Sequence, residues 1–194
     1  HTFSHFWQMV WEQRSCIIVM LTSLFEKDRK KADAYWPDNI GQSTIYGDFV
    51  VTYLNCNVDY KNINIRTFQL SQLNAEREVI SSRSVHQLHY TEWSDMGTPT
   101  TSGLLNLIRL TNICSSVCSS KGYDGPIIAH CSAGVGRAGT FLAVAASQQL
   151  VNNNMSVNVP ILVARLRFQR FGSVQTKQQY SFIYSALQAI TKTN

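Results

Sequence analysis

The sequence contains no apolar run long enough to cross a membrane; "CIIVML" stops after six residues, whereas a spanning helix needs about 20. Charged residues are also scarce, at 15% of the 194 residues, which excludes intrinsic disorder and a charged coiled coil. Internal repeats, low-complexity tracts and interdomain linkers are absent. With 44% hydrophobic residues, the chain predicts a single globular domain with an ample core.

Long basic runs are missing as well. The net charge is +5 and the pI is about 9.0, yet no basic stretch is longer than "DRKK". A well-solvated surface accounts for this charge better than a nucleic-acid interface does. We therefore expect neither nucleic-acid binding nor membrane insertion.

Paired cysteine spacings and a secretory signal peptide are lacking. The five cysteines are an odd number, which favours a reducing, cytoplasmic compartment over a disulfide framework. Cys114 and Cys118 are four residues apart on an expected helix, so they share one face. Without further ligands at metal-binding spacing, core packing is expected there and no metal site.

Hydrophobic periodicity predicts an α/β domain in which α-helices flank a mixed, twisted β-sheet. Helices are expected at residues 3–13, 101–117, 139–151, 158–172 and 176–190. A core strand is expected at 16–21, successive antiparallel strands within 48–90, and a short strand at 127–129. Residues 25–41 and 92–100 are expected to be loops, and a run of Thr and Ser residues offers caps for the helix that starts at 101.

The stretch "HCSAGVGRAGTF" places a cysteine, Cys131, at the end of the short strand and a glycine-rich turn before a helix. Gly134, Gly136 and Gly139 are expected to let the turn fold tightly with its N–H groups pointing inward. A thiolate is favoured beside a helix N-terminus and a fixed cation, and Arg137 supplies that cation. Its planar fork matches two oxygens of a tetrahedral dianion. Together these groups indicate covalent phosphoryl transfer through a thiophosphate.

Three alternatives compete with covalent phosphoryl transfer at this cysteine. A buried cysteine before a glycine turn requires the whole arrangement to be coincidental. A nucleotide-binding loop is disfavoured because no Gly-Lys-Ser/Thr follows. A cysteine protease with His130 as its base is disfavoured because neighbours at a strand end point to opposite faces. We expect His130 to orient the turn by hydrogen bonding.

The stretch "HCSAGVGRAG" resembles the protein tyrosine phosphatase signature of His-Cys, five residues, Arg, Ser or Thr, and Gly. The resemblance covers nearly the whole chain, with "FWQMVWEQ", "IIVMLT", a Glu-Lys loop ending in "YWP", "EWSDMGTP" and "GSVQTKQQY" in the family's order. It implies the family's fold and its tyrosine-specific branch. It also implies hydrolysis of phosphotyrosine in signalling proteins, without metal or cofactor.

The resemblance further implies residue roles. Cys131 matches the nucleophile, Arg137 the phosphate clamp and Asp95 the general acid, which a phenol leaving group of pKa near 10 requires. Gln175 and Gln179 match the glutamines that position water in the second step. The phosphate is expected to lie against the turn formed by Ser132, Ala133, Gly134, Val135, Gly136 and Arg137.

Supporting roles follow in the same way. Glu26 matches the carboxylate that braces the arginine, and Lys31 the lysine near the general acid. Arg167 and Arg170 match arginines just before the glutamines. For these four residues, a solvated surface charge is the competing interpretation.

The sequence departs from the family pattern in three ways. Ala138 replaces a Ser or Thr whose hydroxyl donates to the sulfur, a loss of about 1.5–3 kcal/mol or about 10- to 100-fold in rate. Ser94 replaces the proline of Trp-Pro-Asp, which frees the backbone there. Residues 1–194 are expected to form a phosphatase domain without the family's N-terminal segment. We favour a slow enzyme over a pseudophosphatase that only binds phosphotyrosine.

Overall fold

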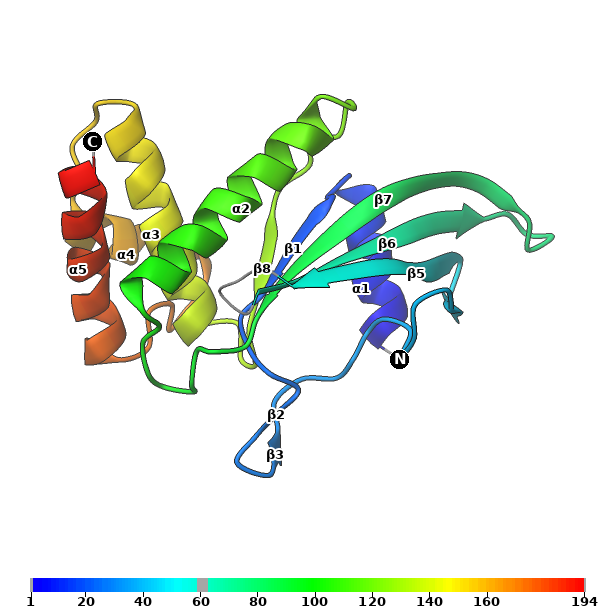
Figure 1. Ribbon diagram of the computed structural model, residues 1–194, viewed down its shortest axis with the longest axis horizontal. Coiled ribbons are helices and arrows are strands. Elements are labelled where there is room, and N and C mark those ends of the chain that lie inside the picture. The colour runs from blue at the N-terminus through cyan, green and yellow to red at the C-terminus, as the bar shows by residue number, and fades with distance from the viewer. Residues whose placement is uncertain (1, 59–62, 194) are drawn as a thin grey trace. The chain divides into compact units, whose positions relative to one another are not determined.

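The computed structural model of this chain describes residues 2–58 and 63–193. His1, Asn194 and residues 59–62 fall outside these ranges, so the expected strands of 48–90 are described on either side of that gap. The chain divides into two compact units. Figure 1 colours the chain from blue near its N-terminus to red near its C-terminus. Unit 1 comprises His1–Met20, Asp33–Tyr90 and Leu110–Ile128, and unit 2 comprises Leu21–Ala32, Thr91–Arg109 and Ala129–Asn194.

A mixed sheet of six strands is built largely from unit 1, with the order β4-β5-β6-β7-β1-β8. Its strands are β1 (Ile17–Met20), β4 (Ser43–Tyr46), β5 (Phe49–Val58), β6 (Ile63–Leu73), β7 (Val79–Tyr90) and β8 (Ile128–His130). Neighbours from β4 to β7 are antiparallel, whereas β1 runs parallel to β7. Figure 1 shows the twist of the long strands β5 to β7. The predicted α/β class with a mixed, twisted sheet is confirmed.

Helix α1 (Thr2–Glu12) contributes the apolar stripe that closes the core of unit 1. Trp7 is fully buried, and its ring lies 6.0 Å from that of Phe68 on β6. The indole N–H of Trp7 donates to the carbonyl of Tyr35 at 2.8 Å, so the ring is buried without losing its hydrogen bond. The guanidinium of Arg83 donates to the carbonyl of Val10 near the end of α1, where a cation is favoured.

Unit 2 is mainly helical. Helix α3 (Gly136–Asn152) packs against α4 (Val159–Gln169) and α5 (Lys177–Thr193), which Figure 1 shows grouped near the C-terminus. Helix α2 (Thr101–Ser119) begins in unit 2 and continues into unit 1. The hydroxyl of Thr100 accepts from the N–H of Gly103 at 3.1 Å, so one of the expected Thr/Ser residues caps this helix.

One expectation about a loop was wrong, and one further short strand was not predicted. Residues 25–41 are not wholly a loop, because β2 (Phe25–Glu26) and β3 (Arg29–Lys30) form a small hairpin. Lys27 and Asp28 both have positive φ, 47° and 60°, as a two-residue turn matched to strand twist requires. Strand β4 also went unpredicted. Both cases involve strands of two to four residues, which are too short for an alternating pattern to be recognised.

The cysteines of the structure carry no disulfide; all five are free. Cys118 is buried and Cys114 half-buried on α2, and burial raises the pKa of both thiols. Across residues 2–58 and 63–193, no helix combines the length and apolarity that a membrane span demands. The same residues contain no group of three potential metal ligands.

Candidate active site

The predicted reacting groups converge on one cavity of about 210 Å³, which lies within unit 2. Four segments supply its walls: the end of the β2–β3 hairpin, the Asp95 loop (residues 92–99), the cysteine loop (residues 130–138) and the glutamine segment (residues 173–179). The lining residues are Lys31, Asp95, Met96, Cys131, Ser132, Ala133, Gly136, Arg137, Gln175 and Gln179. Of the remaining predicted site residues, His130, Gly134, Val135, Ala138 and Glu26 are not among these lining residues.

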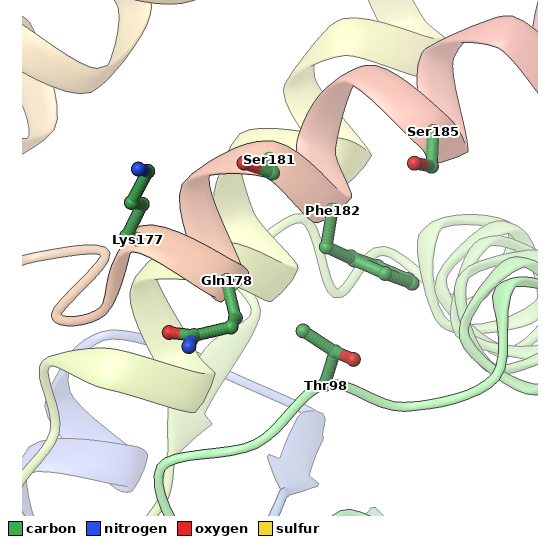
Figure 2. A pocket seen from close by; sticks show the side chains of 6 residues that line it. All are labelled: Thr98, Lys177, Gln178, Ser181, Phe182 and Ser185. Carbon is green, nitrogen blue, oxygen red and sulfur yellow. The ribbon is translucent and has the colours of Figure 1, made fainter.

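A larger hollow of about 510 Å³ lies on the exposed side of α5 (Figure 2). Gln178 and Phe182 project there from the helix toward the segment that carries Thr98. None of the predicted reacting groups lines it. Size therefore does not locate the candidate site, and the smaller cavity around Cys131 does, because a thiol, a guanidinium and a carboxylate meet there.

The cysteine loop connects the end of β8 with the start of α3, as the sequence predicts. Cys131 follows the strand, lines the cavity and is 8% exposed. Gly134 has a φ of +70°, a conformation that other residues rarely adopt. Helix α3 begins after Val135 without a side-chain cap. The N-terminus of this helix therefore favours an anion held beside it.

Gly136 and Gly139 do not adopt positive φ and instead allow a close approach of the backbone. A Cβ at Gly139 would lie 2.7 Å from the backbone nitrogen of Val174. A Cβ at Gly136 would lie 3.0 Å from the side-chain oxygen of Gln175 and 3.1 Å from that of Gln179. The absence of these side chains allows the glutamine segment to lie directly on the start of α3.

The side chain of Arg137 is only 2% exposed, and hydrogen bonds hold its guanidinium in place. Its Nη1 donates to Glu26 Oε1 at 2.5 Å and to the carbonyl of Trp93 at 2.7 Å. Its Nη2 donates to the hydroxyl of Thr22 at 3.0 Å. The predicted neighbour Glu26 therefore does contact the arginine, and the fork is oriented before any anion arrives.

Asp95 lies at the edge of the cavity with three polar neighbours. Its carboxylate accepts a hydrogen bond from Lys31 and lies 3.6 Å from Nη2 of Arg137. Its backbone N–H donates to Glu26 Oε2 at 3.1 Å. The hydrogen bond from Lys31 is the largest effect on the pKa of Asp95 and lowers it. Burial opposes this, but the charges of Lys31 and Arg137 add to the lowering, so the pKa lies below its usual value. The carboxyl is therefore ionised at neutral pH.

Gln179 is almost fully buried, and its amide connects two segments. Its Oε1 accepts the backbone N–H groups of Gln175 at 3.0 Å and Thr176 at 3.2 Å. An oxygen with two donors fixes the orientation of the amide, so Nε2 points the other way and donates to the carbonyl of Gly97 at 3.3 Å. Gln175 is more exposed and lines the cavity beside it.

The two arginines before the glutamines hold backbone in place. Arg167 donates to the carbonyls of Ser173 at 2.9 Å and Val174 at 2.8 Å, where Val174 has an unusual φ of +59°. Arg170 donates to the carbonyl of Ala133 in the cysteine loop at 3.2 Å. The Nδ1 atom of His130 lies 3.3 Å from the carbonyl oxygen of Cys131. Burial lowers the pKa of the His130 imidazole. A neutral histidine at this position donates to that carbonyl if Nδ1 carries the proton.

Comparison with known proteins identifies the family. The family model described as protein-tyrosine phosphatase matches residues 1–189. The chain belongs to the protein-tyrosine phosphatase family. It is 42% identical over 189 residues to receptor-type tyrosine-protein phosphatase epsilon of Rattus norvegicus, covering 96% of this chain and 26% of that protein. It is also 37% identical over 193 residues to tyrosine-protein phosphatase 3 of Dictyostelium discoideum, covering 96% of this chain and 19% of that protein.

The chain thus spans about a quarter or less of these two relatives. It spans 50% of a third, tyrosine-protein phosphatase 2 of Dictyostelium discoideum, to which it is 38% identical over 202 residues. The names agree with the resemblance carried by the cysteine loop, so the predicted family membership is confirmed.

Sequence reasoning missed three residues of the site. Thr22 contacts Arg137, Met96 lines the cavity, and Thr176 joins the glutamine segment to the Asp95 loop. Thr22 directly follows the core strand predicted at 16–21, but no local pattern distinguishes it from an ordinary strand end. Thr176 precedes α5 at a position where a helix cap is common, which was a usable signal.

Proposed function

We propose that this chain hydrolyses phosphotyrosine in proteins through a cysteinyl-phosphate intermediate, with reduced turnover. The observation that carries the proposal is the convergence of Cys131, Arg137 and Asp95 on one cavity. Family membership supports the reaction class. The cysteine loop, which runs into the start of α3, favours an anion and therefore suits a phosphate dianion.

The first step forms a bond from the sulfur of Cys131 to phosphorus and breaks the bond from phosphorus to the tyrosyl oxygen. Arg137 and the N–H groups of the cysteine loop stabilise the charge on the other phosphate oxygens. Asp95 gives its proton to the departing tyrosyl oxygen. Binding of the dianion beside Asp95 raises the pKa of the carboxyl, which offsets the lowering by Lys31 and supplies the protonated form.

The second step hydrolyses the phosphoenzyme. A water molecule positioned by Gln175 and Gln179 attacks phosphorus, Asp95 takes the proton, and the bond from phosphorus to sulfur breaks. The amide of Gln179 has two hydrogens, so the one not donated to Gly97 is available to the water. Ala138 offers no hydroxyl to the leaving sulfur, so we expect this step to be slow.

One experiment separates the slow enzyme from a phosphotyrosine-binding pseudophosphatase. Rapid mixing with an activated aryl phosphate is expected to give a burst near one equivalent per site, followed by a slow steady state. Ala138→Ser is expected to speed the slow phase by about 10- to 100-fold. Cys131→Ser is expected to abolish both phases while phosphotyrosine still binds.

Two results would contradict the proposed phosphatase activity or its nucleophile. Binding of phosphotyrosine without a burst, unchanged by Ala138→Ser, would assign the chain to the binding proteins. Activity retained in the Cys131→Ser variant would remove that cysteine as nucleophile. The domain bounds of residues 1–194 and a cytoplasmic signalling role stay predictions. Phosphotyrosine-containing proteins are the substrates proposed on this basis, and a metal-free, cofactor-free reaction is part of the same proposal.

A further inference from the structure

The N-terminal turn of α5 makes side-chain hydrogen bonds to the Asp95 loop at two consecutive carbonyls. The hydroxyl of Thr176 donates to the carbonyl of Met96 at 3.4 Å. The amide of Gln179 donates to the carbonyl of Gly97 at 3.3 Å. These carbonyls follow Asp95 directly in the chain, so both bonds act within two residues of the carboxyl.

The two donors have little freedom to turn elsewhere. The oxygen of Thr176 also accepts the backbone N–H of Gln179 at 3.1 Å, so its single hydrogen remains for Met96. The oxygen of Gln179 accepts the N–H groups of Gln175 and Thr176, which leaves the amide nitrogen facing Gly97. Each side chain thus caps α5 with its acceptor and reaches the loop with its donor.

The backbone of the Asp95 loop has features that make hydrogen bonds to its carbonyls important for its conformation. Ser94 stands where the family has proline, so the backbone before Asp95 lacks that restraint. Met96 has a positive φ of 59°, a conformation costing free energy in a residue other than glycine. Gly97 completes a turn onto the carbonyl of Ser94 at 3.2 Å, and its own carbonyl also accepts the indole N–H of Trp93 at 2.9 Å.

We infer that Thr176 and Gln179 form a clamp that positions the Asp95 loop for proton transfer, with Thr176 as a positioning residue that the cavity lining does not reveal. The inference rests on the proposed function. The clamp acts through the backbone of Met96 and Gly97, and Thr176 itself touches neither substrate nor reacting atoms. Its loss therefore affects the proton donated by Asp95 and leaves the attack by Cys131 intact.

Thr176 is the clean position for a test, since Gln179 also lines the cavity. Thr176→Val removes both the donor to Met96 and the cap of α5, whereas Thr176→Ser keeps both. Asn158→Ala is the matched control, because Asn158 lies in the same unit and caps a different helix, α4, by accepting from Ile161 at 3.0 Å. Both Thr176→Val and Asn158→Ala lose one helix cap.

For Thr176→Val, the burst rate on a phosphotyrosine peptide is expected to fall about 2- to 10-fold, the worth of one neutral hydrogen bond, because the burst reports the step in which Asp95 donates its proton. An aryl phosphate with an acidic phenol needs no proton at departure, so its burst rate is expected to stay within about 2-fold. Thr176→Ser is expected to match the unaltered protein. Equal losses on both substrates, or the same losses in Asn158→Ala, would reduce Thr176 to a helix cap.

A second measurement does not depend on catalysis. Hydrogen exchange of the backbone amides of Asp95 and Gly97 is expected to be faster in Thr176→Val than in Asn158→Ala. If Thr176→Val fails to fold, Thr176→Asp keeps the cap acceptor and lacks the donor, and the same faster exchange is expected. Unchanged exchange would overturn the clamp. Faster exchange in a protein without phosphatase activity would keep the clamp and reject the proposed function.

Discussion

Glu26→Gln removes one charge from the centre of the hydrogen-bond network while preserving the shape of the side chain. Glu26 Oε1 accepts from Arg137 at 2.5 Å and from the hydroxyl of Thr22 at 3.2 Å, and Oε2 accepts the N–H of Asp95 at 3.1 Å. A glutamine has only one acceptor oxygen at its end. One side of this network must therefore lose its acceptor, and Arg137 loses its charge partner in either orientation.

The expected size of the effect of Glu26→Gln on stability depends on how deeply the two partners are buried. The Arg137 side chain is 2% exposed, so water does not replace the lost partner, while Glu26 is 17% exposed and retains some solvent. Breaking a fully buried ion pair costs about 3–5 kcal/mol, and a hydrogen bond to a charged group contributes about 1.5–3 kcal/mol. The partial exposure of Glu26 places the expected loss of unfolding free energy near the lower range, at about 2 kcal/mol. A loosened Arg137 is expected to lower kcat/KM on phosphotyrosine by about 10- to 100-fold.

Urea denaturation and steady-state kinetics measure the two effects. Glu76→Gln makes the same chemical change on an exposed turn and is expected to shift the unfolding free energy by less than about 0.5 kcal/mol. If Glu26→Gln unfolds at the same urea concentration as Glu76→Gln and keeps its kcat/KM, Glu26 is an ordinary surface charge. The network around Arg137 would then contribute nothing to its orientation.

The remaining predictions concern the proton donor and the glycine contact. Lys31→Met removes the hydrogen bond and charge that lower the pKa of Asp95, so this pKa is expected to rise. The pH above which kcat/KM falls is then expected to move to a higher value. The control variant Lys30→Met is not expected to move it. An unchanged pH in Lys31→Met would show that Asp95 does not supply the proton. Gly139→Ala places a Cβ 2.7 Å from the nitrogen of Val174, so a loss of about 1–3 kcal/mol is expected in thermal unfolding; an unchanged midpoint would contradict the close contact.

Much of the local structure could be predicted from residue patterns. The strand, turn and helix around Cys131 follow from a short apolar run, a glycine-rich turn and a run of helix formers, which are signals between near neighbours. The five long helices were predicted within a few residues of their observed ends. Strands β2, β3 and β4 were not predicted, because they are defined by pairing and carry too few positions for a period to show.

The sequence by itself determined the family, the α/β class and the missing hydroxyl at Ala138, because each depends on residue identity in a contiguous segment. Tertiary structure alone decided how those residues meet. Arg137 and Glu26 are 111 residues apart in the chain, and the amide of Gln179 reaches a carbonyl 82 residues away. No periodicity encodes such contacts, since they arise only when hairpin, loop and helix pack together in unit 2. The lowered pKa of Asp95 and the clamp at Thr176 are products of that packing.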